Sequence, residues 1–264
     1  MTEKWLYTIT INNLTITRWC NVKYMNRVLQ GDCLELMKEI PDKSIDMILC
    51  DLPYGTTACK WDTIIPFEPL WEQYKRIIKD NGTIVLTASQ PFTSALVMSN
   101  PKMFKYEWIW EKHQGTNPMS AKFSPLKSHE NIVVFAKNKT VYNPQMEIGK
   151  PYSGFNSNKV QSEVYGGGRS VHRDNKDGSR YPKTVLRFTK DKGKRSHPTQ
   201  KPVALFEYLI KTYTNEGDLV LDNCAGSGTT GVACKNLNRN YILIEKEPEY
   251  IEIINKRLST QPLQ

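Results

Sequence analysis

The sequence lacks two features that would place the protein at a membrane. In a chain of 264 residues, of which 39% are hydrophobic, no run approaches the roughly eighteen consecutive apolar residues of a membrane-spanning helix. The opening residues, MTEKWLYTITINN, also lack the basic region and apolar core of a signal peptide. We therefore expect a soluble cytoplasmic protein with no membrane partner.

Spacings typical of metal ligands and of paired cysteines are also absent. The six cysteines include no C-x-x-C pair, and no cysteine has a histidine at short range. The four histidines, His113, His129, His172 and His197, show no ligand spacing. The sequence therefore predicts no metal site and no disulfide framework, and we expect reduced, structural thiols.

Positive charge is abundant, and one segment carries it. The formal net charge is +9. Residues 137–201 hold 15 Lys and Arg against five acidic residues, a local +10, so the other 199 residues sum to about neutral. Such a segment indicates contact with a polyanion, although a solvated charged loop would have the same composition.

Length and hydrophobic patterning predict one α/β catalytic domain with an insertion. Residues 7–11 and 14–17 alternate apolar and polar around Asn12-Asn13, as a β-hairpin does. Further along, apolar runs alternate with helical patterns, which is typical of a parallel sheet covered by helices. The expected strands are 46–50, 83–87, 107–110, 131–136, 219–222 and 241–245, and the expected helices are 33–39, 67–79, 91–98, 202–213, 229–236 and 248–258.

A glycine-rich loop follows the fifth expected strand. Gly226, Gly228 and Gly231 spell G-x-G-x-x-G, a turn in which a ligand can lie against the backbone at a helix N-terminus. Glu245 ends the next strand and can accept the hydroxyls of a ribose. Alone, the loop is compatible with a nicotinamide dinucleotide, with S-adenosylmethionine or with a purely structural turn. Asp222 favours S-adenosylmethionine, because a carboxylate repels a pyrophosphate and attracts the methionine ammonium.

A second motif follows the first expected strand. Asp51-Leu52-Pro53-Tyr54 places a carboxylate, a rigid turn and an aromatic ring at the carboxyl edge of the sheet, where ligands bind in open α/β folds. An exocyclic amino nitrogen attacks a methyl sulfonium poorly unless acceptors hold both its hydrogens. The Asp51 carboxylate and the Leu52 carbonyl can be those acceptors. Tyr54 can stack on the base, which must leave the duplex to react. An ordinary Pro-Tyr turn is the alternative interpretation.

In this order, the two motifs resemble the β group of DNA amino-methyltransferases. Residues 31–36 resemble the segment whose acidic residue faces the cofactor adenine, residues 82–86 a strand of the same core, and residues 197–202 the element that helps hold the methionine end. The resemblance covers about 30–137 and 196–258. It implies a Rossmann-like S-adenosylmethionine-dependent methyltransferase fold: a mainly parallel seven-stranded sheet with helices on both faces, plus an inserted target-recognition region.

The resemblance also implies site residues and boundaries. Asp51, Leu52, Pro53 and Tyr54 would be catalytic. The implied cofactor-binding residues are Asp32, Cys33, Asp51, His197, Thr199, Gln200, Lys201, Asp222, Cys224, Gly226, Ser227, Gly228, Thr229, Thr230 and Glu245. The implied boundaries are an N-terminal hairpin or leader at 1–24, a catalytic core at 25–111 and 196–264, and the target-recognition region at 112–195.

Two positions depart from the family pattern. Leu52 replaces the first proline of the usual Asp-Pro-Pro-Tyr, and because that position contributes a carbonyl, we expect activity to survive. Asn223-Cys224 stands where the family often has a proline or an aromatic residue, so packing on the cofactor adenine would differ.

The identity of Asp51 bears on the acceptor. In this family an aspartate there favours adenine N6, whereas enzymes of cytosine N4 more often carry serine, and asparagine would suggest a glutamine methyltransferase. The resemblance thus implies a prokaryotic or phage-encoded, site-specific DNA (adenine-N6) methyltransferase, with an N4-cytosine enzyme as the alternative. A catalytically inactive DNA-binding protein on the same scaffold and a nicotinamide oxidoreductase are alternatives of other classes.

The inserted region suits double-stranded DNA as the partner. Its lysines and arginines can neutralise phosphates, and its tyrosines offer ring surfaces for bases. Arg169, Arg173, Arg180 and Lys183 are the expected DNA contacts, the arginines as candidates for guanine readout. The sequence leaves open the recognition sequence, a homodimer and a restriction nuclease partner.

Overall fold

The chain divides into two compact units. The computed structural model describes residues 5–11, 14–20, 24–56, 59, 62–156, 171–189 and 200–259. The larger unit consists of Met1–Asn143 and Thr184–Gln264, and the smaller unit is Pro144–Lys183. Among the helices described, none has the length and apolar character needed to cross a membrane.

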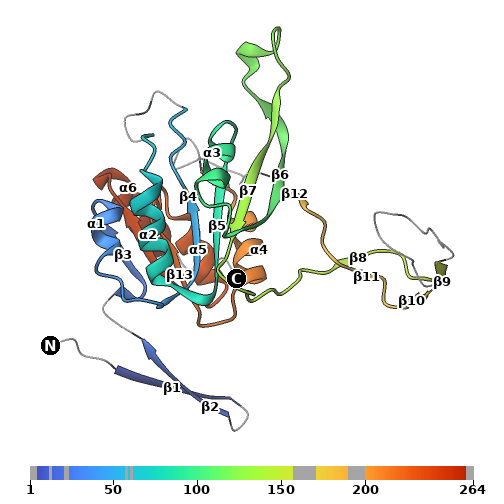
Figure 1. The fold of residues 1–264 in the computed structure, drawn as a ribbon, viewed down its shortest axis with the longest axis horizontal. Coiled ribbons are helices and arrows are strands. Elements are labelled where there is room, and N and C mark those ends of the chain that lie inside the picture. Colours follow the sequence, from blue (N-terminus) through green and yellow to red (C-terminus); the bar gives the residue numbers. More distant parts are fainter. Residues whose placement is uncertain are drawn as a thin grey trace. The chain divides into compact units, whose positions relative to one another are not determined.

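An eight-stranded sheet forms the centre of the larger unit (Figure 1). All its neighbouring strands pair in parallel except β7, which is antiparallel to β5 and β6. The expected mainly parallel sheet is confirmed, with one strand more than seven, because the short strand β12 adds to β6 at the edge. In spatial order the strands are β12 (Val185–Arg187), β6 (Phe104–Thr116), β7 (Lys127–Phe135), β5 (Ile78–Ala88), β4 (Ile45–Asp51), β13 (Leu219–Asp222), β14 (Asn240–Glu245) and β3 (Arg27–Gln30).

Helices cover both faces of this sheet (Figure 1). In β4, Ile48 and Cys50 pack in one buried cluster, with side chains of α1, α2 and α3. Met47 and Leu49 point to the opposite face, where they pack with α4, α5 and α6. The helices are α1 (Cys33–Met37), α2 (Phe67–Ile77), α3 (Phe92–Ser99), α4 (Val203–Tyr213), α5 (Thr229–Asn236) and α6 (Pro248–Ser259).

The helix α2 illustrates how the local sequence specifies this packing. Its buried residues Leu70, Trp71, Tyr74 and Ile77 recur at the spacing of one helix face. Trp71 packs edge-on against Phe135 of β7, with ring centroids 4.9 Å apart. Each such side chain contributes about 1.5–3 kcal/mol when it is buried fully. The helix is therefore held on the sheet by its apolar face.

The acidic residues of the predicted site lie at one edge of the sheet. The parallel strands β4, β13 and β14 end at Asp51, Asp222 and Glu245. Because β7 runs antiparallel to β5, its first residues lie at this same edge, where Glu130 pairs with Trp110 of β6. Ligands bind at the carboxyl ends of parallel strands, so this edge is where a site is expected.

The strands β6 and β7 continue past the end of β5 as a two-stranded arm (Figure 1). We call residues 112–129 the β6–β7 arm and residues 117–126 its tip. Thr116 pairs with Lys127 at the base of the tip. The short helix η2 (Pro118–Ser120) lies within the tip.

In its described residues, the smaller unit contains two short antiparallel pairs of strands. In the first, β8 (Glu147–Ile148) pairs with β11 (Ser179–Arg180), and in the second β9 (Tyr152–Asn156) pairs with β10 (Val171–Asn175). This unit is shorter than the expected region 112–195, because β6, β7 and β12 belong to the main sheet of the larger unit. Its role in target recognition stays a prediction.

The expected N-terminal hairpin is present. β1 (Trp5–Ile11) pairs antiparallel with β2 (Leu14–Cys20), and Ile11 lies opposite Leu14 across the turn. The alternation of apolar and polar residues therefore identified both strands, and the predicted turn at 12–13 lies outside the described residues.

Candidate active site

Both oxygens of the Asp51 carboxylate accept hydrogen bonds at the end of β4. Oδ1 accepts from the Tyr54 hydroxyl at 2.8 Å and from the Thr87 hydroxyl. Oδ2 accepts from the Lys201 ammonium at 2.5 Å. The Asp51 side chain is 24% exposed, so it remains accessible from the cavity described below. Three side chains thus fix the orientation of a carboxylate that a ligand can still reach.

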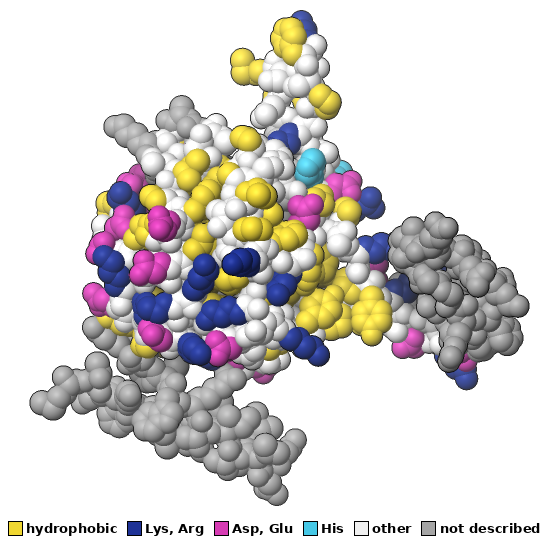
Figure 2. All heavy atoms as spheres, viewed as in Figure 1, with side chains coloured by type: hydrophobic (Ala, Val, Ile, Leu, Met, Phe, Trp, Pro, Cys, Tyr) yellow, Lys and Arg dark blue, Asp and Glu magenta, His cyan; other side chains and the backbone are white. Residues whose placement is uncertain are grey.

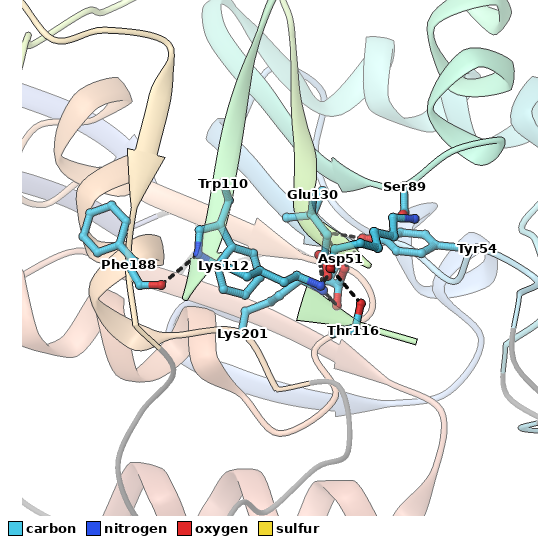
Figure 3. Close-up of polar contacts among 11 residues, drawn as sticks. Asp51, Tyr54, Ser89, Trp110, Lys112, Thr116, Glu130, Phe188 and Lys201 are labelled. Carbon is cyan, nitrogen blue, oxygen red and sulfur yellow. Dashed lines mark hydrogen bonds and ion pairs between the residues drawn. The ribbon is translucent and has the colours of Figure 1, made fainter. Parts of the chain in front are cut away.

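Lys201 belongs to a buried row of alternating charges (Figure 3). Its ammonium lies 3.3 Å from Glu130 Oε2 as well as 2.5 Å from Asp51 Oδ2. Glu130 Oε1 lies 2.5 Å from the Lys112 ammonium. The side chains of Lys201, Lys112 and Glu130 are only 7%, 9% and 13% exposed. Two carboxylates therefore balance two ammonium groups where water contributes little.

The row keeps its inner members charged. Burial works against the charge of Lys201, but Asp51 and Glu130 outweigh it and hold the pKa of Lys201 above its ordinary value. Burial also works against the charge of Glu130, but Lys201 and Lys112 hold the pKa of Glu130 below its ordinary value. At neutral pH, Lys201 is an ammonium that donates to Asp51 and has no capacity to accept a proton.

Tyr54 lies between Asp51 and the helix α3. Its ring stacks on Phe92, with centroids 5.2 Å apart and an interplanar angle of 29°. The Lys201 ammonium lies 5.7 Å from the centroid of the same ring. Burial and the Asp51 charge raise the pKa of Tyr54, so its hydroxyl stays protonated and serves as a donor. The ring is thereby held in place at the cavity wall.

Asp62 shapes the turn that follows Tyr54. Its carboxylate accepts from the backbone N–H groups of Gly55 and Thr56, each at 2.9 Å. Gly55 has φ of 66°, in the left-handed region that favours glycine. The buried Asp62 therefore fixes the turn after the tetrapeptide.

Asp222, at the end of β13, is a buried carboxylate that is only 3% exposed. Oδ1 accepts from the Cys224 N–H at 3.1 Å, and Oδ2 accepts from the Thr230 hydroxyl at 2.5 Å. Burial raises the pKa of Asp222 to about 7, although these hydrogen bonds oppose the rise. A cation beside this carboxylate would favour its ionised form.

Glu245 closes the glycine loop from the end of β14. Its Oε2 accepts from the Gly226 N–H at 2.7 Å, and its Oε1 accepts from the N–H groups of Lys246 and Glu247 at 2.8 and 2.9 Å. Burial raises the pKa of Glu245. Since each oxygen has two lone pairs, Oε2 retains one for another donor.

The helix α6 holds the other side of the loop. Arg257 donates to the Ser227 carbonyl at 2.6 Å and to the Thr229 hydroxyl at 3.3 Å. Gly228 has φ of 77°, and a Cβ there would lie 3.0 Å from Ile254. The loop thus requires glycine at position 228 for its backbone conformation and for its close approach to α6.

One cavity of about 770 Å³ joins the tetrapeptide to the glycine loop. This volume is within the roughly 300–1,000 Å³ range of small-molecule pockets. Thr116, Asn117 and Lys127 of the arm also line it. The predicted site residues in its lining are Asp32, Cys33, Asp51, Leu52, Pro53, Tyr54, Gln200, Lys201, Asp222, Cys224, Gly226, Ser227, Thr229 and Glu245.

Several predicted site residues have a different structural role or lie away from the cavity. Gly228 and Thr230 shape the loop without lining the cavity, and the Asp32 side chain caps α1 by accepting from the Leu34 N–H at 2.9 Å. Arg180 and Lys183 are exposed on the smaller unit. The predicted residues His197, Thr199 and Arg169, and the side chain of Arg173, lie outside the described residues.

Sequence reasoning missed Glu130, Lys112, Thr87, Asp62 and Arg257. Glu130 immediately precedes an expected strand and Lys112 follows one, so both carried the signal of a charged residue at a strand end. Placing these two residues at the active-site edge also requires the direction of β7, which only the sheet topology supplies. No cluster of three or more metal-ligating side chains occurs in the part of the chain that the structure describes.

Known proteins share this sequence and this architecture. A family model described as DNA methylase matches residues 45–256. The Type II methyltransferase M.HpaI of Haemophilus parainfluenzae is 31% identical over 254 residues, which cover 89% of this chain and 74% of that protein. The Type II methyltransferase M.HinfI of Haemophilus influenzae is 30% identical over 268 residues, which cover 89% and 68%.

Solved structures share the fold. The crystal structure of the M1.HpyAVI–SAM complex matches with a TM-score of 0.62 and 27% identity, over 89% of this chain and 99% of that chain. PvuII DNA methyltransferase, described as cytosine-N4-specific, has a TM-score of 0.63 at 17% identity, over 90% of this chain and 87% of that chain, a likeness of fold alone.

Proposed function

We propose that this chain, which belongs to the N6/N4 family of DNA methylases, transfers a methyl group from S-adenosylmethionine to the N6 amino group of adenine in double-stranded DNA. Family membership makes it an S-adenosylmethionine-dependent DNA methyltransferase. The acceptor nitrogen and the roles of individual residues are the proposal. Its bacterial Type II relatives support a site-specific cytoplasmic enzyme of a prokaryote.

The position of Asp51 carries the proposal. Its carboxylate is anchored by three donors, yet it is reachable from the cavity that also contains the glycine loop. Leu52 lines the same cavity, and its side chain belongs to the buried core cluster, which supports a contribution through its main chain. Two acceptors for one amino group are therefore adjacent.

The residues near the glycine loop suit the cofactor. S-adenosylmethionine supplies a methyl group on a positively charged sulfur, and it carries an ammonium and ribose hydroxyls. The buried Asp222 gains from a neighbouring cation, because its pKa of about 7 reflects uncompensated burial. Glu245 Oε2 can accept from one ribose hydroxyl while it holds the Gly226 N–H. Asp222 therefore suits the ammonium of the methionine part, and Glu245 suits the ribose.

Catalysis follows from what Asp51 does to the amino group of the base. Asp51 Oδ2 has a second lone pair beside the one that Lys201 occupies, so it can accept one amino hydrogen, and the Leu52 carbonyl can accept the other. Holding both hydrogens turns the nitrogen lone pair toward the methyl group. As the nitrogen forms its bond to the methyl carbon, the bond from that carbon to the cofactor sulfur would break, with its electron pair staying on sulfur. The nitrogen gains positive charge in this step, and the Asp51 charge stabilises it. The nitrogen then loses one proton, to Asp51 or to water.

The direct test is the identity of the methylated base. Wild-type enzyme would be incubated with labelled S-adenosylmethionine and unmethylated DNA, and the DNA digested to nucleosides. We expect the label in N6-methyl-2′-deoxyadenosine. Label in N4-methylcytosine would contradict the adenine assignment while leaving the reaction intact. Absence of transfer to DNAs of varied sequence would overturn the proposed activity.

A further inference from the structure

The tip of the β6–β7 arm exposes large apolar side chains. Met119 is 94% exposed and Phe123 is 89% exposed, and Leu126, the last residue of the tip, is 48% exposed. Every residue from 117 to 126 is exposed. Figure 2 shows hydrophobic side chains gathered at the end of this projection. Contiguous exposed apolar groups mark surfaces that contact a partner.

Hydrogen bonds within the tip and at its base hold its backbone in a defined turn. The N–H groups of Ser120, Ala121 and Phe123 donate to the carbonyls of Asn117, Pro118 and Ser120 at 3.1, 3.2 and 2.9 Å. At the base, the Thr116 hydroxyl donates to the Lys127 carbonyl at 3.1 Å. These bonds present Met119 and Phe123 outward on an ordered turn.

The charge of the arm suits a polyanion. Between positions 112 and 127 the sequence contains three lysines and no acidic residue. Lys112 is paired with Glu130 inside the site, whereas Lys122 is exposed at the tip. An apolar end with a basic side chain matches nucleic acid, whose stacked bases are apolar and whose backbone is anionic.

The arm is also continuous with the active site. Its residues Thr116, Asn117 and Lys127 line the cavity that contains Asp51. DNA whose target base enters this cavity therefore passes the base of the arm, with the tip a few residues away.

We propose that the arm tip inserts into the DNA duplex beside the target base, with Phe123 and Met119 occupying the space that the extruded base leaves. This inference rests on the proposed function. A base that leaves the stack exposes its neighbours and its orphaned partner to water, and apolar side chains between base steps offset that loss. The arm thus lowers the cost of extruding the base, while Asp51 acts on the base in the cavity.

The test compares two DNA substrates that differ only in how firmly the target base is held. One is a paired duplex containing a site that the wild-type enzyme methylates, and the other has an abasic position opposite the target. For the double variant Phe123→Ala, Met119→Ala, we expect kcat/KM to fall tenfold or more on the paired duplex. On the abasic duplex we expect a fall of less than threefold. Met98→Ala, which alters an exposed methionine on α3, should leave both rates unchanged.

A second readout follows the base itself. With 2-aminopurine at the target position, wild-type binding should raise the fluorescence, and the double variant should give little increase at saturating protein. Equal rates for variant and wild type on both duplexes would overturn the proposal. An equal loss of kcat/KM on both duplexes would also overturn it. If the double variant then also changed its oligomeric state, the tip would instead be a contact with a second copy of the chain. Absence of methyl transfer by the wild type would instead count against the proposed function.

Discussion

The substitution Glu130→Gln tests whether the buried row of charges stabilises the active-site edge. Glutamine has the shape of glutamate without its charge, so the change leaves Lys112 without its ion-pair partner at 2.5 Å. The Lys112 side chain is 9% exposed and the Lys201 side chain is 7% exposed. Lys201, which pairs with both Asp51 and Glu130 in the wild type, would retain only its ion pair with Asp51. The variant therefore buries a positive charge with little compensation.

The expected loss of stability is large. Removing one partner of a buried ion pair costs about 3–5 kcal/mol, because the remaining charge stays away from water. For a chain of this size, that corresponds to a decrease in Tm on the order of 10 °C. Urea denaturation followed by circular dichroism measures the free energy of unfolding, and calorimetry measures the Tm.

A matched control has the same substitution in an exposed pair. Glu35 lies 2.8 Å from Lys38, with side chains 69% and 57% exposed, so we expect Glu35→Gln to cost less than about 1 kcal/mol. Adding Lys112→Met to Glu130→Gln should restore part of the lost stability, since it removes the uncompensated charge. If Glu130→Gln and Glu35→Gln lower the free energy of unfolding by the same amount, the buried row does not stabilise the active-site edge.

Two further predictions concern the glycine loop. Because a bound ammonium favours ionised Asp222, whose pKa is about 7, binding of S-adenosylmethionine below that pH must release a proton. Its affinity should therefore rise by up to about tenfold per pH unit between about pH 5 and 7 and level off above, as measured by calorimetry; an equally steep slope in Asp222→Asn would contradict the assignment. Gly228→Ala places a Cβ 3.0 Å from Ile254 at a φ of 77° and should lower the free energy of unfolding by about 1–3 kcal/mol. Gly154→Ala, which meets no atom within 4 Å, is its control, and equal stability of the two variants would argue against the strain.

Much of the core could be predicted, because strong local signals marked its elements. The apolar run at 219–222 and the helix at 229–236 coincide with β13 and α5, since a glycine loop delimits both. The strand β3 (Arg27–Gln30) was missed, because this edge strand is only partly buried and has just two apolar residues between polar ends. β12, at three residues, is a strand only because β6 offers it an edge.

The site was predictable in its motifs and less so in its contacts. Asp51, Asp222 and Glu245 each ended an expected strand, and parallel pairing brings them to one edge. Lys201 was predicted to bind the cofactor, but its ammonium lies on Asp51, a contact between residues 150 positions apart that no local pattern encodes. The position of Glu130 depended on the antiparallel direction of β7.

The most direct test of the central claim is methyl transfer by Asp51→Asn. The variant keeps the size of the side chain but loses the charge, and calorimetry with S-adenosylmethionine would establish that the cavity is intact. We predict that the rate of N6-methyladenine formation falls on the order of 10²–10³-fold while the affinity for S-adenosylmethionine stays within about threefold of wild type. Methylation at the wild-type rate by a variant that binds the cofactor normally would contradict the role of Asp51.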